Sequence, residues 1–216
     1  MPDPKPVRAS FVVVVGGHSR NIGKTSVAAA LIAAFPQLGW TAMKITQFGH
    51  GICSANGREC SCAIDEHAYA IMEERNREGR TDTSRFLVSG ARRSFWVRTK
   101  QGRLALAMPE LETFFRTDPF VIIESNSILR FLIPDLYMVV LKPEVDDFKQ
   151  SAREFLGKAD AAVVVESKRS LTSWECVPTA QLNRLPMFHV APPEFFSQEL
   201  KDFVGSRLKT VLTGLP

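Results

Sequence analysis

A glycine-bounded polar loop between an apolar run and a helix-forming segment carries the clearest chemical signal in this sequence. The apolar run Phe11 to Val15 precedes the loop, and an alanine-rich segment follows it. Backbone N–H groups of such a loop turn inward around a polyphosphate, and the first turn of the next helix adds unpaired N–H groups and the positive end of its dipole. Lys24 is then expected to reach the β and γ phosphates, and the Thr25 hydroxyl to ligate Mg²⁺. The residues predicted to contact the nucleotide here are Gly17, His18, Ser19, Arg20, Asn21, Ile22, Gly23, Lys24, Thr25 and Ser26.

The spacing of this loop departs from the usual GxxxxGK(S/T) pattern by one residue. His18 stands where the first glycine would fall, and Gly17 lies one position earlier. The His18 side chain is therefore expected either to touch a phosphate or to face solvent. The alternative for the whole loop, a βα turn that binds nothing, requires Lys24 and Thr25 to be there by coincidence.

A carboxylate at the end of a second apolar run supplies the other half of this chemistry. Phe120 to Ile123 lead into Glu124, and Asn126 and Ser127 follow at the same rim, where they are expected to orient water or substrate. An acid at the tip of a neighbouring strand holds Mg²⁺ or its water shell opposite the phosphates, because this hard cation prefers oxygen ligands. We assign Lys24 and Glu124 the catalytic roles, and Thr25 and Glu124 the Mg²⁺ site. The alternative is a strand-end glutamate that faces solvent.

Three cysteines lie close together in an insert at about residues 50–67. Cys53, Cys60 and Cys62 offer soft ligands, and His67 is the best candidate for a fourth. Three thiolates and an imidazole would complete a tetrahedral Zn²⁺ site, and the thiolates could instead hold part of an iron–sulfur cluster. The spacing is not that of a CxxC pair, so redox thiols and inert cysteines stay open as alternatives.

Composition agrees with an enzyme-sized cytoplasmic domain. The chain has 216 residues, 45% of them hydrophobic, with a net charge of +4, and it shows no targeting or membrane-spanning segment, so we expect no membrane partner. The charge is too small to argue for nucleic acid as a partner. Between Arg75 and Arg103, however, nine basic residues meet only Glu78 and Asp82. This stretch suits an anionic small-molecule substrate, or it is a solvated basic face.

Apolar runs alternate with helical patterns along the chain, which predicts an α/β fold. We expect one domain over residues 1–216, with three layers and a mostly parallel, twisted sheet of about seven strands covered by helices on both faces. The predicted strands are Phe11 to Val15, Thr41 to Ile45, Ser94 to Thr99, Phe120 to Glu124, Leu136 to Leu141, Ala161 to Glu166 and Met187 to Val190. The predicted helices are Lys24 to Phe35, Ile64 to Glu78, Thr83 to Ser89, Glu110 to Arg116, Asp146 to Leu156 and Pro193 to Leu212. Arg98 to Arg103 resembles a hairpin turn, which predicts one antiparallel pair.

The length of the loop resembles that of P-loop proteins of the dethiobiotin-synthetase-like group. Lys44 after a strand, the segment Asp82-Thr-Ser-Arg85 and Val-Ile-Ile-Glu124 are similar to motifs of molybdopterin-guanine dinucleotide biosynthesis protein B (MobB), over about residues 11 to 130. The resemblance implies that Asp82, Thr83 and Arg85 line the site beside the γ-phosphate or a second phosphorylated ligand. It also implies a GTP-binding homodimer that assists molybdenum-cofactor maturation beside a partner enzyme of that biosynthesis.

Two departures from that family matter. Ser125 replaces the glycine that normally follows the strand-end acid. Ser167 to Ser170 occupy the place of the Asn-Lys-x-Asp guanine motif without its carboxylate, although Lys168 could stack on the base. The sequence therefore leaves GTP and ATP open.

Three functions remain at this stage. The leading hypothesis is a slow Mg²⁺-dependent GTPase or ATPase of cofactor maturation. The alternatives are a nucleotide-controlled carrier of a metal or iron–sulfur cluster, and an ATP-dependent small-molecule kinase or ligase.

Overall fold

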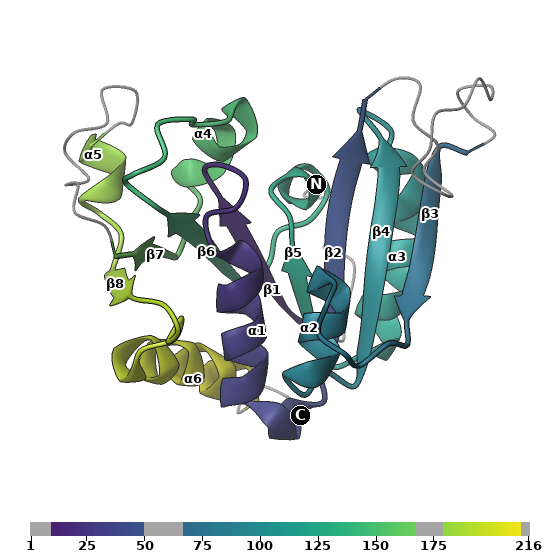
Figure 1. The fold of residues 1–216 in the computed structure, drawn as a ribbon, viewed down its shortest axis with the longest axis horizontal. Coiled ribbons are helices and arrows are strands. Elements are labelled where there is room, and N and C mark those ends of the chain that lie inside the picture. Colours follow the sequence, from purple (N-terminus) through teal and green to yellow (C-terminus); the bar gives the residue numbers. More distant parts are fainter. Residues whose placement is uncertain (1–9, 50–66, 167–178, 213–216) are drawn as a thin grey trace, which may run out of the picture.

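The structure is a computed structural model, and it describes residues 10–49, 67–166 and 179–212. Eight strands form one sheet in the order β3-β4-β2-β5-β1-β6-β7-β8 (Figure 1). The strands are β1 Phe11–Gly17, β2 Thr41–Phe48, β3 Tyr69–Glu74, β4 Arg93–Lys100, β5 Phe120–Glu124, β6 Leu136–Leu141, β7 Ala161–Val165 and β8 Met187–Val190. The α-helices are α1 Lys24–Ala34, α2 Asp82–Val88, α3 Leu104–Thr117, α4 Gln150–Leu156, α5 Thr179–Leu182 and α6 Gln198–Leu212. Short 3-10 turns cover Pro36–Leu38 and Ser127–Arg130.

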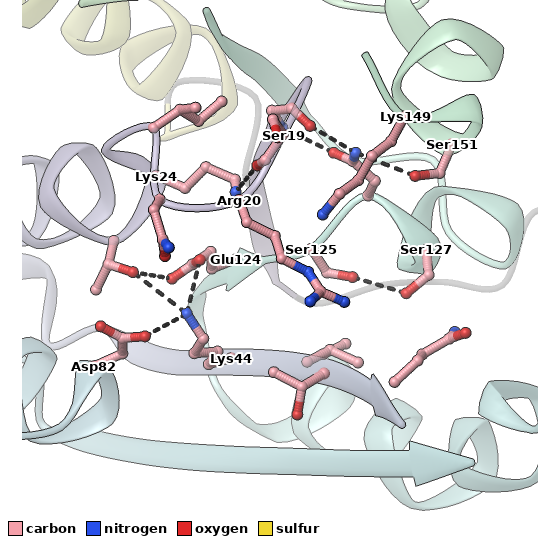
Figure 2. A pocket seen from close by; sticks show the side chains of 18 of the residues that line it. Ser19, Arg20, Lys24, Lys44, Asp82, Glu124, Ser125, Ser127, Lys149 and Ser151 are labelled. Carbon is pink, nitrogen blue, oxygen red and sulfur yellow. Dashed lines mark hydrogen bonds and ion pairs between the residues drawn. The ribbon is translucent and has the colours of Figure 1, made fainter. Parts of the chain in front are cut away.

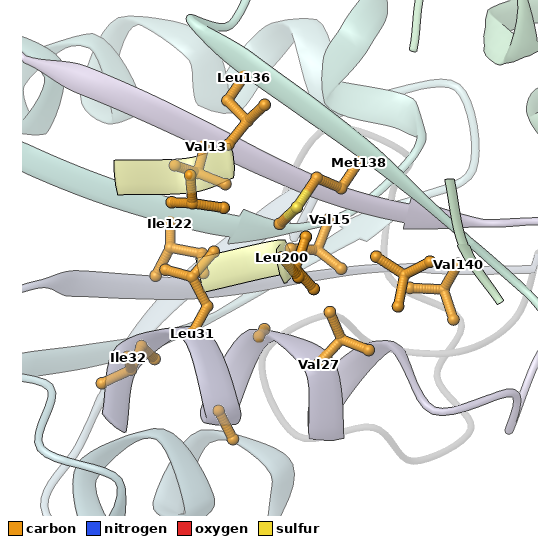
Figure 3. Packing of buried hydrophobic residues seen from close by; sticks show 14 of the residues in the cluster. Val13, Val15, Val27, Leu31, Ile32, Ile122, Leu136, Met138, Val140 and Leu200 are labelled. Carbon is orange, nitrogen blue, oxygen red and sulfur yellow. The ribbon is translucent and has the colours of Figure 1, made fainter. Parts of the chain in front are cut away.

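The central strand β1 is buried on both faces, which explains its uninterrupted run of valines. Val12 and Val14 belong to a core under α3 and α4, whereas Val13 and Val15 belong to a core under α1, α2 and α6. Figure 3 shows the second core, where Leu31 of α1 lies against the side chains of the sheet. The fold is therefore a three-layer α/β sandwich, as the sequence predicts.

All neighbouring strands are parallel except β3 and β4. The strand β3 contradicts the sequence prediction of a helix from Ile64 to Glu78. Residues Tyr69–Glu74 instead pair antiparallel with β4, with Tyr69 opposite Thr99 and Glu74 opposite Ser94. Tyr69 and Ile71 pack on the core while Met72 is 45% exposed, so the alternation of a half-buried strand outweighs the helix propensity of Ala, Met and Glu.

The predicted hairpin turn at Arg98 to Arg103 is also wrong. The chain does turn after β4, but Leu104 then begins the helix α3 rather than a strand. The antiparallel pair that exists is formed by β3, which precedes β4 in the chain. No helix among the described residues combines the length and the apolar character needed to cross a bilayer.

Candidate functional site

A cleft with a volume of about 1240 Å³ lies at the carboxyl ends of the central strands. The chain leaves β1 towards α1 on one face of the sheet, and it leaves β6 towards α4 on the other face. In open α/β sheets a crevice forms where neighbouring strands lead to opposite faces, and ligands bind there. The loop between β1 and α1 forms the floor of this cleft.

The backbone of the Gly17–Gly23 loop requires its two bounding glycines. A Cβ on Gly17 would lie 2.8 Å from Cδ1 of Ile22, so the loop closes tightly over this position. Gly23 has a φ of +100°, a conformation that side chains rarely adopt, and a Cβ there would also approach Phe195. Asn21 takes a φ of 54°, which asparagine tolerates better than most residues.

Asn126 fixes the start of the loop by two hydrogen bonds to one residue. Its Oδ1 accepts from the Gly17 N–H at 2.9 Å, and its Nδ2 donates to the Gly17 carbonyl at 2.8 Å. The sequence placed Asn126 at the rim only as a group for water or substrate. Its role in the structure is to position the loop, and no sequence motif signals this role.

Lys24 is held inside the loop. Its Nζ donates to the Ser19 carbonyl at 2.5 Å, and burial lowers the pKa of Lys24 to about 8 although Glu124 opposes this effect. Charge-assisted hydrogen bonds are stronger than neutral ones. An anion in the loop would therefore be a better partner for this ammonium than the carbonyl of Ser19.

Four side chains from four elements meet beside Lys24 (Figure 2). The Thr25 hydroxyl donates to Oε2 of Glu124 at 2.7 Å, and the Lys44 ammonium donates to Oε1 at 2.9 Å. The same ammonium forms an ion pair with Oδ2 of Asp82 at 2.5 Å. Burial lowers the pKa of Lys44, but the two carboxylates outweigh burial and the net pKa is raised.

Strand register explains why this cluster forms. Lys44 of β2 is the direct partner of Glu124 at the end of β5, so the two side chains project from adjacent strands at the same level. The strand β2 continues past this point to Phe48, whereas the sequence predicts that it ends at Ile45. Asp82 reaches the cluster because it begins α2.

The oxygen donors of this cluster suit a magnesium ion. Thr25, Asp82 and Glu124 provide one hydroxyl and two carboxylates, and Mg²⁺ is typically held by one or two carboxylates together with phosphates and water. Lys44 supplies a positive charge among the same oxygens.

Arg85 and Thr83 illustrate how the helix α2 divides its polar side chains. Arg85 lines the cleft and donates to the Ser26 hydroxyl at 2.9 Å. Thr83 is buried and donates to Oε2 of Glu74 at 2.9 Å, away from the cleft. Of the residues that the family resemblance placed here, Asp82 and Arg85 line the cleft and Thr83 does not.

The His18 side chain contradicts both sequence expectations, since it neither faces solvent nor lines the cleft. Its Nε2 accepts from the Lys142 N–H at 3.1 Å, and Nδ1 lies 2.9 Å from the Asp147 carbonyl. The ring also stacks on Phe148 at 5.2 Å. These contacts make the ring a neutral donor and acceptor between backbone groups, and burial lowers the pKa of His18.

The basic stretch Arg75 to Arg103 lies largely outside the cleft. Of its nine basic residues, all in the described part of the chain, only Arg85 lines the cleft. Arg92 pairs with Asp118 at 2.7 Å and Arg93 with Glu73 at 3.1 Å, so these arginines fix the sheet and its connections. Other basic side chains also line the cleft although they belong to no sequence motif, namely Arg130, Lys142 and Lys149.

An apolar wall closes the cleft beyond Gly23. Val165, Pro192 and Phe195 form this wall at the ends of β7 and β8. The sequence analysis gives none of the three a role in the site, because apolar side chains at a strand end or in a connecting segment carry no distinctive pattern. Lys168, which was expected to stack on the base, lies outside the described residues.

The cysteine insert also falls outside the described residues. This applies to Cys53, Cys60 and Cys62, whereas His67 is described and exposed. Within residues 10–49, 67–166 and 179–212, no group of three His, Cys, Asp or Glu side chains could hold a metal ion. The Zn²⁺ or iron–sulfur site therefore remains a prediction.

Comparison with known proteins bears on the fold. No protein-family model and no curated protein matches the chain. The hydrogenase maturation factor HypB from Archaeoglobus fulgidus aligns with a TM-score of 0.50 and 15% identity, over 93% of this chain and 91% of that chain. HypB from Helicobacter pylori in complex with nickel aligns with a TM-score of 0.48 and 16% identity, over 94% and 87% of the two chains. LpxK from Aquifex aeolicus in complex with ATP aligns with a TM-score of 0.47 and 17% identity, over 83% of this chain and 53% of that chain. The alignment with HypB from A. fulgidus, together with the sheet order, shows that this chain has the fold of P-loop NTPases.

Proposed function

We propose that this protein binds a nucleoside triphosphate with Mg²⁺ and transfers its γ-phosphoryl group to water or to a second substrate. One observation carries the proposal: the Thr25 hydroxyl meets the Glu124 carboxylate at 2.7 Å, directly behind the loop that encloses Lys24. A loop lysine, a hydroxyl and a strand-end acid are the parts that phosphoryl-transfer sites of this fold share.

Each residue has a distinct task in this reaction. Backbone N–H groups of the Gly17–Gly23 loop bind the phosphates, and the Lys24 ammonium exchanges the Ser19 carbonyl for a phosphate oxygen. Thr25, Glu124 and Asp82 are the groups that would hold Mg²⁺, which when bound neutralises charge on the phosphates. Lys44 keeps a further positive charge beside the transferred group.

The base and the biological setting are narrower proposals. Val165, Pro192 and Phe195 offer an apolar surface to the base, and such a surface accepts adenine and guanine alike. The MobB resemblance adds a role in molybdenum-cofactor maturation, with a homodimer and a partner enzyme as its setting. What supports this addition is that Lys44, Asp82, Arg85 and Glu124 line the same cleft.

The first test removes the loop lysine. Lys24→Ala is expected to weaken binding of ATP or GTP analogues by roughly 10- to 100-fold, the worth of one charged hydrogen bond. Binding is measured by titration with a fluorescent analogue, and the fold is checked by circular dichroism. Lys201→Ala, an exposed lysine on α6, serves as the matched control. Wild-type affinity in the Lys24 variant would overturn the assignment of the loop.

The second test addresses the acid. Glu124→Gln is expected to keep nucleotide binding without metal but to raise the Mg²⁺ concentration needed for hydrolysis by roughly 10-fold or more. Glu110→Gln, at an exposed position of α3, is the control. An unchanged Mg²⁺ titration in the Glu124 variant would show that this carboxylate does not serve the metal.

A further inference from the structure

The cleft is longer than a nucleotide requires. Ligand pockets usually measure about 300–1,000 Å³, and this cleft reaches about 1240 Å³. Its lining runs from Phe195, beyond β7, to Gln101 at the end of β4. The strands β7 and β4 are five positions apart in the sheet, which corresponds to roughly 24 Å at the usual strand spacing.

A nucleotide on the loop would use only one arm of this cleft. With its phosphates on the Gly17–Gly23 loop and its base against Phe195, it extends from β1 towards β7 and β8. The opposite arm lies over the ends of β5, β2 and β4. Its lining consists of Thr46, Gln47, Phe48, Gly49, Gln101, Gly102, Ser125, Ser127 and Arg130.

The charge of the cleft is also larger than one nucleotide balances. Seven basic side chains line it, against the two acids Asp82 and Glu124. Lys44 is already paired with both acids, and Mg²⁺ cancels part of the charge of a triphosphate. Arg130 is also paired, with Glu154 at 2.7 Å, and Arg85 lies 3.9 Å from Asp82. Arg20, Lys142 and Lys149 are therefore the lining cations, in the described part of the protein, that a bound nucleotide would leave without an ion pair.

Two of these cations stand where the arms meet. Arg20 and Lys149 extend into the cleft on the side of Ser125 (Figure 2), and no ion pair connects either of them to a side chain in the described part of the protein. Burial lowers the pKa of Lys149 and the charge of Arg20 lowers it further, while Asp147 partly opposes both effects. The hydroxyls of Ser125 and Ser127 lie beside the Arg20 guanidinium (Figure 2) and 3.0 Å from each other.

We propose that the arm over β5, β2 and β4 is a second substrate subsite, which binds an anionic acceptor between Arg20 and Lys149. The acceptor is a polar small molecule with a carboxylate or phosphate group, and its remainder contacts the hydroxyls and amides of this arm. The proposal rests on the phosphoryl-transfer function above. An oxyanion lone pair attacks the γ-phosphorus, the bond to the β-phosphate oxygen breaks, and its electron pair leaves on the nucleoside diphosphate, so no proton need move. The two cations offset the repulsion between the acceptor and the γ-phosphate.

Inorganic phosphate is a suitable probe, provided that the loop is already filled. The full chain is saturated with Mg²⁺ and a β,γ-imido nucleotide analogue, and phosphate binding is followed by ³¹P line broadening and calorimetry. The wild type is expected to bind phosphate saturably. Arg20→Ala and Lys149→Ala are each expected to weaken phosphate binding by 10-fold or more. Lys149→Ala is expected to change analogue affinity less than threefold, and Lys201→Ala is expected to change neither affinity.

The outcomes separate this inference from the proposed function. Displacement of phosphate by acetate would support a carboxylate acceptor, and displacement by methyl phosphate alone would support a phosphate ester. If both variants kept wild-type affinity for phosphate, or if the loaded wild type bound no phosphate, the second subsite would be overturned while nucleotide binding stood. Failure of the wild type to bind the analogue would instead overturn the proposed function.

Discussion

His18 and Asn126 determine the geometry of the candidate site by holding the Gly17–Gly23 loop in place. His18 connects the loop to the segment after β6 through the Lys142 N–H and the Asp147 carbonyl, and Asn126 holds both backbone groups of Gly17. Both residues satisfy buried polar groups that would otherwise be costly. The geometry of the loop thus depends on side chains that a motif search would not select.

The buried His18 ring should make the stability of the fold sensitive to acid. Burial lowers the pKa of His18, the hydrogen bonds with the Asp147 and Lys142 backbone only partly oppose this effect, and the nearby Lys24 lowers the pKa further. The imidazole therefore binds a proton more readily in the unfolded chain than in the folded protein. As a result, the free energy of unfolding falls as the pH drops through 6.5, the ordinary pKa of histidine. Phe148 and the Lys142 backbone complete the surroundings of the ring.

Urea denaturation between about pH 7.5 and 5.5 measures this effect. The wild type is expected to lose stability over this interval. His18→Asn, which cannot titrate but can both donate and accept, should lose less. Parallel losses in the two proteins would show that other groups cause the acid sensitivity.

At the level of elements, the sequence predicts the strands that are buried on both faces correctly, and it misplaces helix ends that depend on tertiary contacts. All seven predicted strands are confirmed. The clearest are β1, β6 and β7, because every residue in them is buried. The predicted start of α3 at Glu110 is too late, since Leu104 and Ala107 enter the core and the helix continues through Pro109. The predicted start of α4 at Asp146 is too early.

Contacts with the loop explain the late start of α4. The Lys149 N–H donates to the His18 carbonyl at 2.9 Å, and the Ser19 hydroxyl donates to Asp147 at 2.7 Å. These bonds hold residues 147–149 in a non-helical course until Gln150. The site itself was predictable where it follows the loop motif and the strand-end acid, whereas Lys149 and Asn126 depend on distant packing.

The edge strand β3 can be tested through its alternation. Ile71 packs on the core and Met72 is 45% exposed, so Ile71→Ala is expected to cost about 1–2 kcal/mol and Met72→Ala less than about 0.5 kcal/mol. Chemical denaturation of both variants measures the difference. Equal losses of stability in the two variants would contradict the strand and favour the predicted helix for this segment.

At the scale of the whole molecule, one sheet connects two cores and the cleft. Val12 and Val13 lie next to each other in β1 but enter opposite cores, and the same strand leads into the Gly17–Gly23 loop. Neither core can loosen without exposing one face of this strand. The expectation of a single domain over the chain thus has a physical consequence, namely that both layers of helices unfold together.

Substitutions in the two cores provide the test. Leu31 of α1 and Leu111 of α3 are fully buried on opposite faces, so Leu31→Ala and Leu111→Ala are each expected to cost about 2–5 kcal/mol. Because both cores share the sheet, each variant should shift one common transition, with tryptophan fluorescence and far-ultraviolet circular dichroism in coincidence. Val88→Ala, at a site that is 60% exposed, should leave the transition nearly unchanged. Two separate transitions, each sensitive to only one of the leucines, would show that the layers fold independently and would contradict the single domain.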